Sequence, residues 1–343
     1  MSLLPHIRQP HPLSVAPMID WTDRHCRYFH RLIAPRAVLY TEMITTGAII
    51  HGGAQRYLAH DESEHPLVLQ LGGSDPGELA EAVRQARPFG FDAINLNVGC
   101  PSDRVLSGRF GACLMAEPAL VAELAAAMLD ASEVPVTIKT RIGIDDGPVP
   151  DMLDELVDRC AERGVETFVI HARKAWLNGL SPKENREIPP LSHETVHALA
   201  RRRPDLSIHI NGGITEIDQA VRLADGLAGV MLGRKAYQDP LTLAVFENAL
   251  TRDGPAKKTP DPFDIVEKMA AYAGQQARNG TPLRAIARHM LGLFNNRPGA
   301  RRWRRMLGEN MHDRHATADL MREAAALVAG APSRDAEALA ERA

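Results

Sequence analysis

Residues able to move a proton or hold a cofactor recur along the first 235 positions, each directly after a short apolar run. Cys100 follows DAINLNVG, and a loop thiol with an ordinary pKa of about 8.5 is mostly protonated at neutral pH and can act as an acid. Lys139 ends the run VTIK, where a buried cation needs an anionic partner or a Schiff-base carbonyl. His171 follows FVI and is either a core histidine or a site residue. The other candidates at such positions are Pro17-Met18, Glu42-Met43, Gln70, Asn97, Arg141, Asn211 and Gly233-Arg234.

Two glycine-containing loops offer a second kind of chemistry, the binding of a phosphate group. Asn211-Gly212-Gly213 follows one apolar run, and a helical pattern begins near Thr215. Glycine lets backbone N–H groups approach an anion closely, and a helix N-terminus favours negative charge. The next apolar run ends in Gly233-Arg234-Lys235, which adds two cations. A tight turn is the alternative for the first loop, but the two loops together favour a phosphate.

The apolar runs in front of these residues indicate the fold. Amphipathic helical patterns such as GELAEAVRQAR and MLDELVDRCAERG separate most of the runs, as in parallel βαβ units. Eight units predict an α/β protein with a (β/α)8 TIM barrel; a doubly wound open sheet is the alternative. We expect the strands at Leu13–Ala16, Ala37–Thr41, Leu67–Leu71, Ala93–Asn97, Val136–Thr140, Phe168–His171, Ile208–Asn211 and Gly229–Leu232.

A barrel explains why chemically capable residues follow the strands. Barrel active sites lie at the carboxyl ends of the strands, and phosphate often binds between the loops after strands seven and eight. The candidates above would then form a ring around one mouth. A scaffold without chemistry needs no such ring, so the positions predict an enzyme.

Length and composition set the class of protein. The chain has 343 residues, of which 45% are hydrophobic and 24% charged, which excludes a disordered chain and a coiled coil. Its four cysteines form no CxxC pair and no cluster at zinc spacing, so we expect reduced thiols and no metal. The N-terminus has no apolar signal segment, and no stretch is long enough to span a membrane. We expect a cytoplasmic monomer with no membrane partner.

The charge distribution points to a polyanionic partner, although the net charge is −3. Between Lys268 and Gly308 there is no acidic residue, while nine Lys and Arg residues occur there, so the rest of the chain is strongly acidic. A solvated helix face usually mixes signs, whereas a basic module on an acidic body is typical of nucleic-acid binding.

This basic stretch also marks a second domain. Residues 251–262, TRDGPAKKTPDP, have the composition of a linker. We expect helices at about 261–280, 281–294 and 299–310. Residues 1–250 are then the barrel domain, 263–331 a small C-terminal all-helical domain, and 332–343 a frayed tail.

Seven strings, in this order, give the chain a family resemblance: VAPMIDWTD, INLNVGCPS, GACLM, IKTRIG, VIHAR, INGGI and VMLGR. Together they resemble the tRNA-dihydrouridine synthases over about residues 13–310. The strings HGGAQRYL, HARKAWLNGLSPKENREIPPL and HMLGLFNNRPGARRWRR are similar to the A-type members. The resemblance implies an FMN-dependent, NADPH-using enzyme that reduces uridine in the D-loop of tRNA, at positions 20 and 20a.

The resemblance also implies a role for each candidate. Cys100 would donate a proton to C5 of the uracil, while N5 of reduced FMN gives a hydride to C6. Asn97 would lie near the uracil. The residues implied to bind FMN are Pro17, Met18, Ile19, Gln70, Lys139, His171, Asn211, Gly212, Gly213, Gly233 and Arg234. Those expected to bind tRNA are Lys183 and Arg186 in the loop after the sixth strand, and Arg297, Arg301 and Arg304 in the basic segment.

Three other functions remain alternatives. A flavoenzyme acting on a free pyrimidine such as dihydroorotate would not need the clustered cations. A Schiff-base aldolase would use Lys139 as its nucleophile and would be colourless. An RNA-binding protein with an inactive barrel would not need the ring of site residues.

Overall fold

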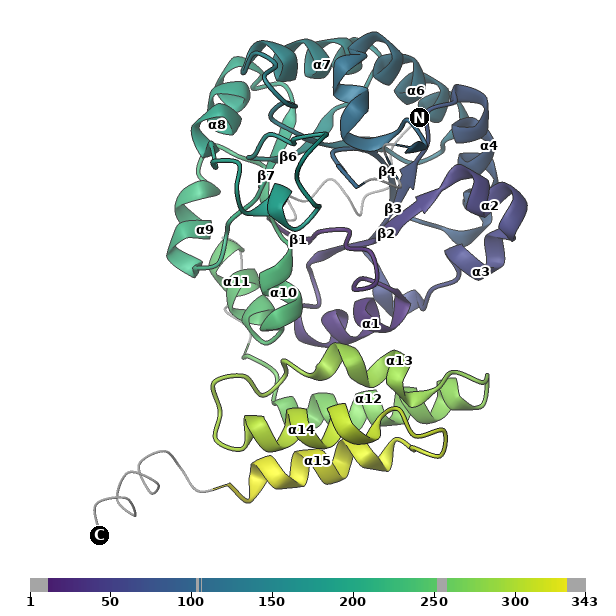
Figure 1. The fold of residues 1–343 in the computed structure, drawn as a ribbon, viewed down its shortest axis with the longest axis vertical. Helices are drawn as coiled ribbons and strands as arrows, with labels where there is room; N and C mark the ends of the chain where they lie inside the picture. The colour runs from purple at the N-terminus through teal and green to yellow at the C-terminus, as the bar shows by residue number, and fades with distance from the viewer. Residues whose placement is uncertain (1–11, 103–104, 106, 252–257, 332–343) are drawn as a thin grey trace. The chain divides into compact units, whose positions relative to one another are not determined.

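The computed structural model describes residues 12–102, 105, 107–251 and 258–331. Eight parallel strands form a closed barrel in the order β1 to β8 (Figure 1). The predicted TIM barrel is confirmed, and the open sheet is wrong because β1 pairs with β8 as well as β2. The strands are β1 (Leu13–Val15), β2 (Val38–Thr45), β3 (Leu67–Gly72), β4 (Ala93–Val98), β5 (Val136–Arg141), β6 (Thr167–His171), β7 (Ser207–Asn211) and β8 (Gly229–Leu232).

β2 extends further than its sequence pattern indicates. The apolar pattern ends at Thr41, whereas the strand continues to Thr45. Its pairing with β3 shifts between Tyr40 and Met43, and the ladder resumes with Met43 opposite Gln70. Such an irregularity re-aims side chains without ending the strand. Glu42 and Met43 therefore lie inside β2 rather than after it, which corrects their predicted position.

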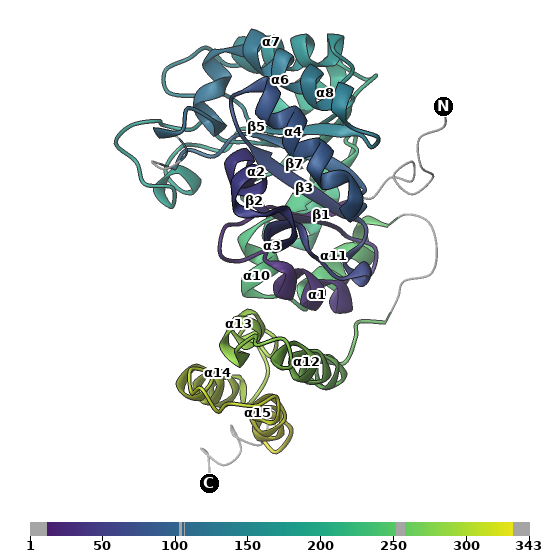
Figure 2. The ribbon, with the colours of Figure 1, turned by 90° about the vertical axis from the view of Figure 1, so that its right-hand side faces the viewer.

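Side chains fill the barrel, and helices cover its outside. Tyr40, Val68, Ala93, Val169 and Met231 form one buried cluster. The helix α4 begins where the sequence indicates, with Pro76 in its first turn and the Asp75 carboxylate accepting from the Glu78 amide (2.8 Å). Figure 2 shows the barrel from a second side. The helices of this unit are α2 (Thr46–Gly52), α3 (Ala54–Leu58), α4 (Pro76–Ala86), α6 (Pro118–Ala131), α7 (Asp151–Glu162), α8 (His193–Arg202) and α9 (Ile217–Leu223), with short 3₁₀ turns η1 (Glu62–Glu64), η2 (Arg87–Phe89), η3 (Gly111–Ala116) and η4 (Glu184–Arg186).

Contacts group the remaining helices into a second compact unit. Residues 25–35 and 234–248 belong to this unit together with the C-terminal helices, although they lie within the range 1–250. The boundaries at 250 and 263 therefore remain a prediction. The helices are α1 (Arg24–Ile33), α10 (Arg234–Gln238), α11 (Thr242–Leu250), α12 (Pro262–Ala277), α13 (Leu283–Ala287), η5 (Arg288–Met290), α14 (Ala300–Asn310) and α15 (Asp319–Ala329).

Aromatic side chains explain this grouping. Tyr28 of α1 stacks on Tyr272 of α12, with ring centroids 4.0 Å apart, and His25 Nδ1 lies 2.8 Å from the Tyr272 hydroxyl. Trp303 of α14 is fully buried, packs edge-on against Phe294, and donates its indole N–H to the Met290 carbonyl (3.1 Å). These contacts link α1 to α12 and α14 to the segment after α13.

The helical expectations for this unit are met in part. α12 and α14 lie where two helices are expected, but the middle one, expected over 281–294, ends as α13 at Ala287 and continues only as the turn η5. A Cβ on Gly292 would lie 2.4 Å from the Gln238 carbonyl oxygen, so this segment packs backbone to backbone against the end of α10. α15 lies beyond the expected helices. Most of the expected linker, residues 252–257, and the tail 332–343 lie outside the described residues.

Candidate active site

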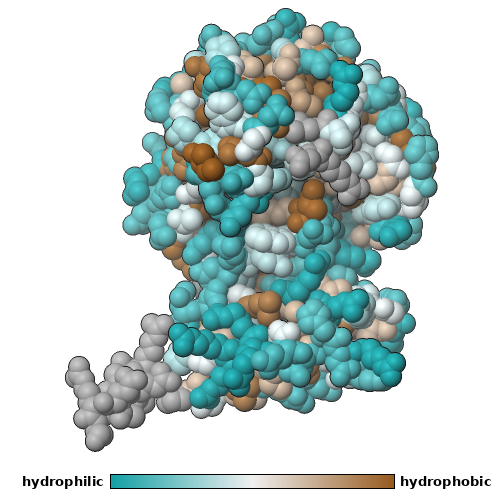
Figure 3. Space-filling model, viewed as in Figure 1, coloured by the Kyte–Doolittle hydropathy of each residue, from teal (hydrophilic) through white to brown (hydrophobic). Residues whose placement is uncertain are grey.

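The carboxyl ends of five neighbouring strands, β3 to β7, hold eight of the predicted site residues. Parallel pairing fixes which of them lie side by side. Figure 3 shows this face of the barrel, which is hollowed at its centre. The paired positions are Gln70 with Asn95, Asn97 with Lys139, Arg141 with His171, and His171 with Asn211.

Gln70 and Asn97 are buried and joined by their amide groups. Asn97 Nδ2 donates to Gln70 Oε1 (2.9 Å), and Gln70 Nε2 donates to Asn95 Oδ1 (2.7 Å). Asn95 is fully buried and was not among the predicted site residues. The signal for it is the spacing in INLN, because residues two apart on a strand share one face.

Cys100 is partly exposed in the loop after β4. The backbone N–H groups of Gly99 and Cys100 both donate to Asn97 Oδ1, at 3.1 and 3.0 Å, and the Cys100 carbonyl accepts from the Ala112 amide (2.9 Å). The thiol lies 3.5 Å from the Ser102 hydroxyl oxygen. The backbone on both sides of the thiol is therefore held, while the residue as a whole is partly exposed.

Arg141 ties this loop to the loop after β6, a role that the sequence did not indicate. Its guanidinium is buried and donates to the carbonyls of Gly99, Lys174 and Asn185, each at 2.9 Å. Burial lowers the pKa of Arg141 to about 10, and a negative charge at Cys100 raises it. Arg141 therefore places a fixed positive charge near the thiol.

Lys139 is a desolvated cation at the same level. Its ammonium donates to Asn211 Oδ1 (3.2 Å), whose own Nδ2 donates to the Met231 carbonyl (2.8 Å). Burial first, and then the charge of Arg141, lower the pKa of Lys139 from 10.5 to about 7, while a negative charge at Cys100 raises it. A cation held by a neutral amide favours a further anion.

His171 and the two glycines after β7 pack against each other. Gly212 and Gly213 have φ of +114° and +67°, a region that other residues rarely adopt. A Cβ on Gly212 would lie 2.5 Å from His171 Cδ2. Burial and the charge of Arg141 hold the pKa of His171 well below its usual value, so the imidazole is neutral.

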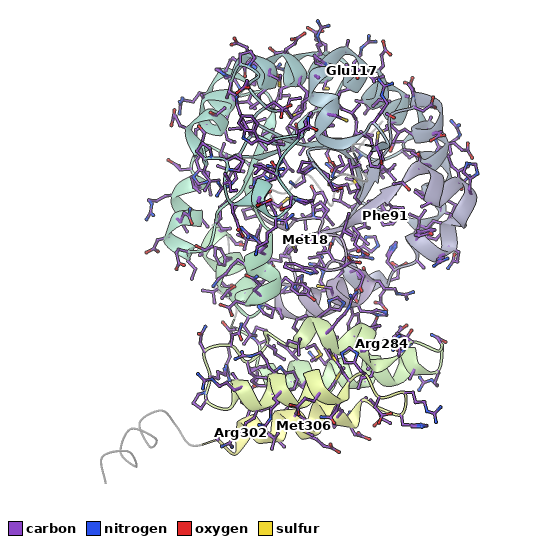
Figure 4. The ribbon with its side chains drawn as sticks, viewed as in Figure 1. Met18, Phe91, Glu117, Arg284, Arg302 and Met306 are labelled. Atoms are coloured by element: carbon purple, nitrogen blue, oxygen red, sulfur yellow. The ribbon has the colours of Figure 1, made fainter. Side chains whose placement is uncertain are left out.

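The loop after β1 is held by a local hydrogen-bond pair. The Met18 amide donates to the Thr22 hydroxyl (2.9 Å), which donates back to the Met18 carbonyl (3.2 Å). Pro17 and Met18 are partly exposed, and Ile19 is 53% exposed. Figure 4 labels Met18 near the middle of the barrel face.

The remaining predicted residues lie in two places. Lys183 and Arg186 are exposed in the loop after β6; Lys183 directly precedes the turn η4, which holds Asn185 and ends with Arg186. Gly233 follows β8 and has nothing within 3.9 Å of its Cβ position, whereas Arg234 begins α10 of the second unit.

The second unit carries the predicted tRNA arginines. Arg297, Arg301 and Arg304 are all exposed, and Arg304 also donates to Asn295 Oδ1 (2.6 Å). Because Ala300, Trp303 and Leu307 form the buried side of α14, its four arginines stay on the solvent side. Figure 4 labels two basic residues of this unit, Arg284 of α13 and Arg302 of α14.

The residues in the barrel fit a phosphorylated flavin. Two successive glycines at positive φ form a turn of the kind whose backbone N–H groups can bind an anion, and Lys139 supplies a cation with a neutral partner. Gln70 retains amide capacity beside them, suited to the polar edge of an isoalloxazine ring. Within the described ranges, no group of three or more His, Cys, Asp or Glu residues could hold a metal ion. No helix in that part of the chain is long and apolar enough to cross a membrane.

Comparison with known proteins agrees with this geometry. Residues 14–329 match the family model described as dihydrouridine synthase. The chain is 54% identical to tRNA-dihydrouridine(20/20a) synthase of Vibrio parahaemolyticus over 318 residues, 92% of this chain and 96% of the relative. It is 53% identical to the protein of that name from Yersinia pestis, with 95% of each chain covered, and 52% identical to that of Escherichia coli K12, with 92% and 91% covered. The chain belongs to the dihydrouridine synthase family.

Proposed function

We propose that this chain reduces the C5=C6 bond of uridine to 5,6-dihydrouridine in the D-loop of tRNA, at positions 20 and 20a, using FMN that NADPH reduces. The observation that carries the proposal is the placement of Cys100. Cys100 is partly exposed in the loop after β4, on a backbone held by Asn97, and the charges of Lys139 and Arg141 interact with its charge. The (20/20a) relatives support the choice of positions.

Different residues around the mouth bind different parts of the cofactor. Bound reduced FMN supplies a hydride to C6 of the uracil. Lys139 and Gln70 hold the polar edge of the flavin ring, His171 lies beside the ring, and the backbone of Pro17, Met18 and Ile19 covers it. The phosphate is held by Asn211, Gly212, Gly213, Gly233 and Arg234.

Cys100 completes the reduction on the other face of the uracil. Its S–H bond breaks, and the proton goes to C5 as C6 gains the hydride, so two electrons and two hydrogens add across the double bond. The thiolate that remains is attracted to Lys139 and Arg141, whose pKa values a negative Cys100 raises. A proton from solvent then restores the thiol.

The substrate is a tRNA rather than a free pyrimidine. A uridine stacked inside folded tRNA must be extruded to reach the mouth, so binding depends on phosphate contacts outside the barrel. The exposed side chains of Arg297, Arg301 and Arg304 suit that purpose, with Lys183 and Arg186 near the mouth. An enzyme for free dihydroorotate has no use for these residues.

The decisive experiment maps dihydrouridine in tRNA by mass spectrometry. tRNA is compared from cells with and without this chain, and after incubation of unmodified tRNA with purified protein, FMN and NADPH. We expect a gain of 2 hydrogens at positions 20 and 20a. If cells without this chain lost dihydrouridine only at other positions, the enzyme would act at those positions instead of 20 and 20a. If no position changed, the proposal would be contradicted.

A further inference from the structure

The hydrogen bonds below the candidate site form a chain whose direction is fixed at one end. Backbone N–H groups only donate, so the Asn97 atom that accepts from both Gly99 and Cys100 is its oxygen. Asn97 Nδ2 must then face Gln70 Oε1, and Gln70 Nε2 must face Asn95 Oδ1. The hydrogen bonds thus run in one direction from the Cys100 loop through two buried amides to Asn95, so each amide can keep its orientation only if its neighbours keep theirs.

This series of hydrogen bonds ends on β5. Asn95 Nδ2 donates to the hydroxyl oxygen of Thr137 (2.9 Å), and the Thr137 hydroxyl in turn faces the Ile94 carbonyl (3.4 Å). Asn95 is 0% exposed, Gln70 1% and Thr137 6%, so water does not compete for these bonds. Four side chains on three strands therefore connect the Cys100 backbone to the wall of the barrel.

This arrangement decides which groups remain for ligands. An amide nitrogen carries two hydrogens. Asn97 donates one of them to Gln70, and Gln70 donates one to Asn95. Each nitrogen keeps one N–H for the carbonyl oxygens of a uracil or a flavin. If Asn95 lost its orientation, Gln70 could turn its oxygen outward, and an acceptor would face those carbonyls.

We propose that Asn95 is a positioning residue: it fixes the orientation of Gln70 and Asn97, and through Asn97 the backbone of Cys100. Asn95 touches no reactant, and its role rests on the proposed function. A merely structural role would cost stability alone. A positioning role costs turnover as well, because small displacements of reacting groups slow a reaction by about 10- to 100-fold.

The test compares two identical changes on one strand. Thr137→Val removes the acceptor for Asn95, whereas Thr140→Val removes a hydroxyl that donates to the Val98 carbonyl (3.2 Å) outside the chain of amides. We expect both variants to lose similar thermal stability. Only Thr137→Val should lose turnover on tRNA, by about tenfold or more, with unchanged affinity for tRNA. Thr137→Ser should restore it, and Asn95→Leu should lose at least as much turnover as Thr137→Val.

A second readout needs neither flavin nor tRNA. In a Cys113→Ala background, the rate of Cys100 alkylation by iodoacetamide reports how firmly the loop is held. We expect faster alkylation in Thr137→Val and Asn95→Leu, and the parental rate in Thr140→Val. Equal turnover and alkylation in the Thr137 and Thr140 variants would overturn the proposal. If the wild-type protein fails to reduce tRNA, the proposed function fails, and the alkylation rates still decide the role of Asn95.

Discussion

At the scale of single residues, the Cys100 thiol interacts with the charges of two cations, Arg141 and Lys139. Arg141 is held by three carbonyls and Lys139 by one amide, so neither charge moves freely. A thiolate at Cys100 and these cations attract one another, because each pKa responds to the charge of the thiol. Fixed charges aimed at a developing anion need no reorganisation during the reaction.

The assignment of the proton donor predicts a clear split between two half-reactions. Cys100→Ala should reduce tRNA about 10²–10⁴-fold more slowly, because a positioned general acid is lost. FMN content and NADPH oxidation without tRNA should not change, since neither step uses the thiol. The control is Cys113→Ala, whose thiol donates to the Phe110 carbonyl (3.2 Å) and should not be needed. If Cys113→Ala lost tRNA reduction while Cys100→Ala kept it, the proton donor would be Cys113 and the assignment of Cys100 would be wrong.

The lowered pKa of Lys139 predicts a pH-dependent stability difference. In the folded protein the pKa is about 7, against an ordinary 10.5, so between these values the unfolded chain binds more protons. The free energy of unfolding contributed by Lys139 therefore rises as pH increases from about 7 towards 10.5. Below pH 7 the folded protein bears the full cost of the buried charge.

Lys139→Met measures this effect directly. Without bound flavin, urea unfolding should show wild type gaining stability relative to the variant when pH is raised from 6.5 to about 9.5. Titrating groups that do not interact with Lys139 cancel in the comparison. A stability difference that is the same at both pH values would contradict the lowered pKa.

At the scale of elements, the turn after β7 depends on glycine for two reasons that can be separated. Gly212 has a positive φ, and its Cβ position lies 2.5 Å from His171. Gly226 also has a positive φ (+71°) but has nothing within 4 Å of its Cβ position. An alanine at 226 bears backbone strain of about 1–2 kcal/mol. One at 212, where φ is +114°, bears at least as much and also displaces the histidine.

Gly212→Ala should therefore cost more than Gly226→Ala. We expect Gly226→Ala to lower the free energy of unfolding by about 1–2 kcal/mol and to retain its FMN. Gly212→Ala should be less stable still and should copurify with less FMN. Denaturant unfolding and flavin absorbance measure the two effects. The same stability and full FMN content in both variants would show that the turn does not form the cofactor site.

At the scale of the whole molecule, the two units carry different parts of the proposed function. The barrel unit holds the chemistry, and the second unit presents arginines to solvent because α14 buries only its Ala300, Trp303 and Leu307 side. Each phosphate contact that a Lys or Arg makes releases counterions, so binding by such a surface weakens as salt increases.

The triple variant Arg297→Ala, Arg301→Ala, Arg304→Ala should bind tRNA more weakly. Its logarithmic salt slope should decrease by about 0.7–0.9 for each lost phosphate contact. FMN content and NADPH oxidation without tRNA should stay at the wild-type level. The matched control removes three exposed arginines from barrel helices, Arg159, Arg201 and Arg222, and should keep the slope. An unchanged slope in the first variant would exclude these arginines from the interface.

The barrel could be predicted from sequence because its information is local. A buried parallel strand needs a short apolar run, and a covering helix needs an amphipathic pattern, so eight repeats of the two specify the closed topology. Chemically capable residues could be found because they must follow the strands. Cys100, Lys139 and His171 are predicted as site residues in this way.

What only the tertiary structure decided depends on pairing between distant segments. Asn95 and Arg141 make contacts on other strands and loops, and no pattern within one strand reports which carbonyl or amide will face them. The lowered pKa of Lys139 comes from burial and from a neighbouring charge. The membership of α1 in the second unit comes from an aromatic pair 244 positions apart, Tyr28 and Tyr272. Local patterns determine which elements form, whereas desolvation and side-chain contacts exist only once those elements have packed.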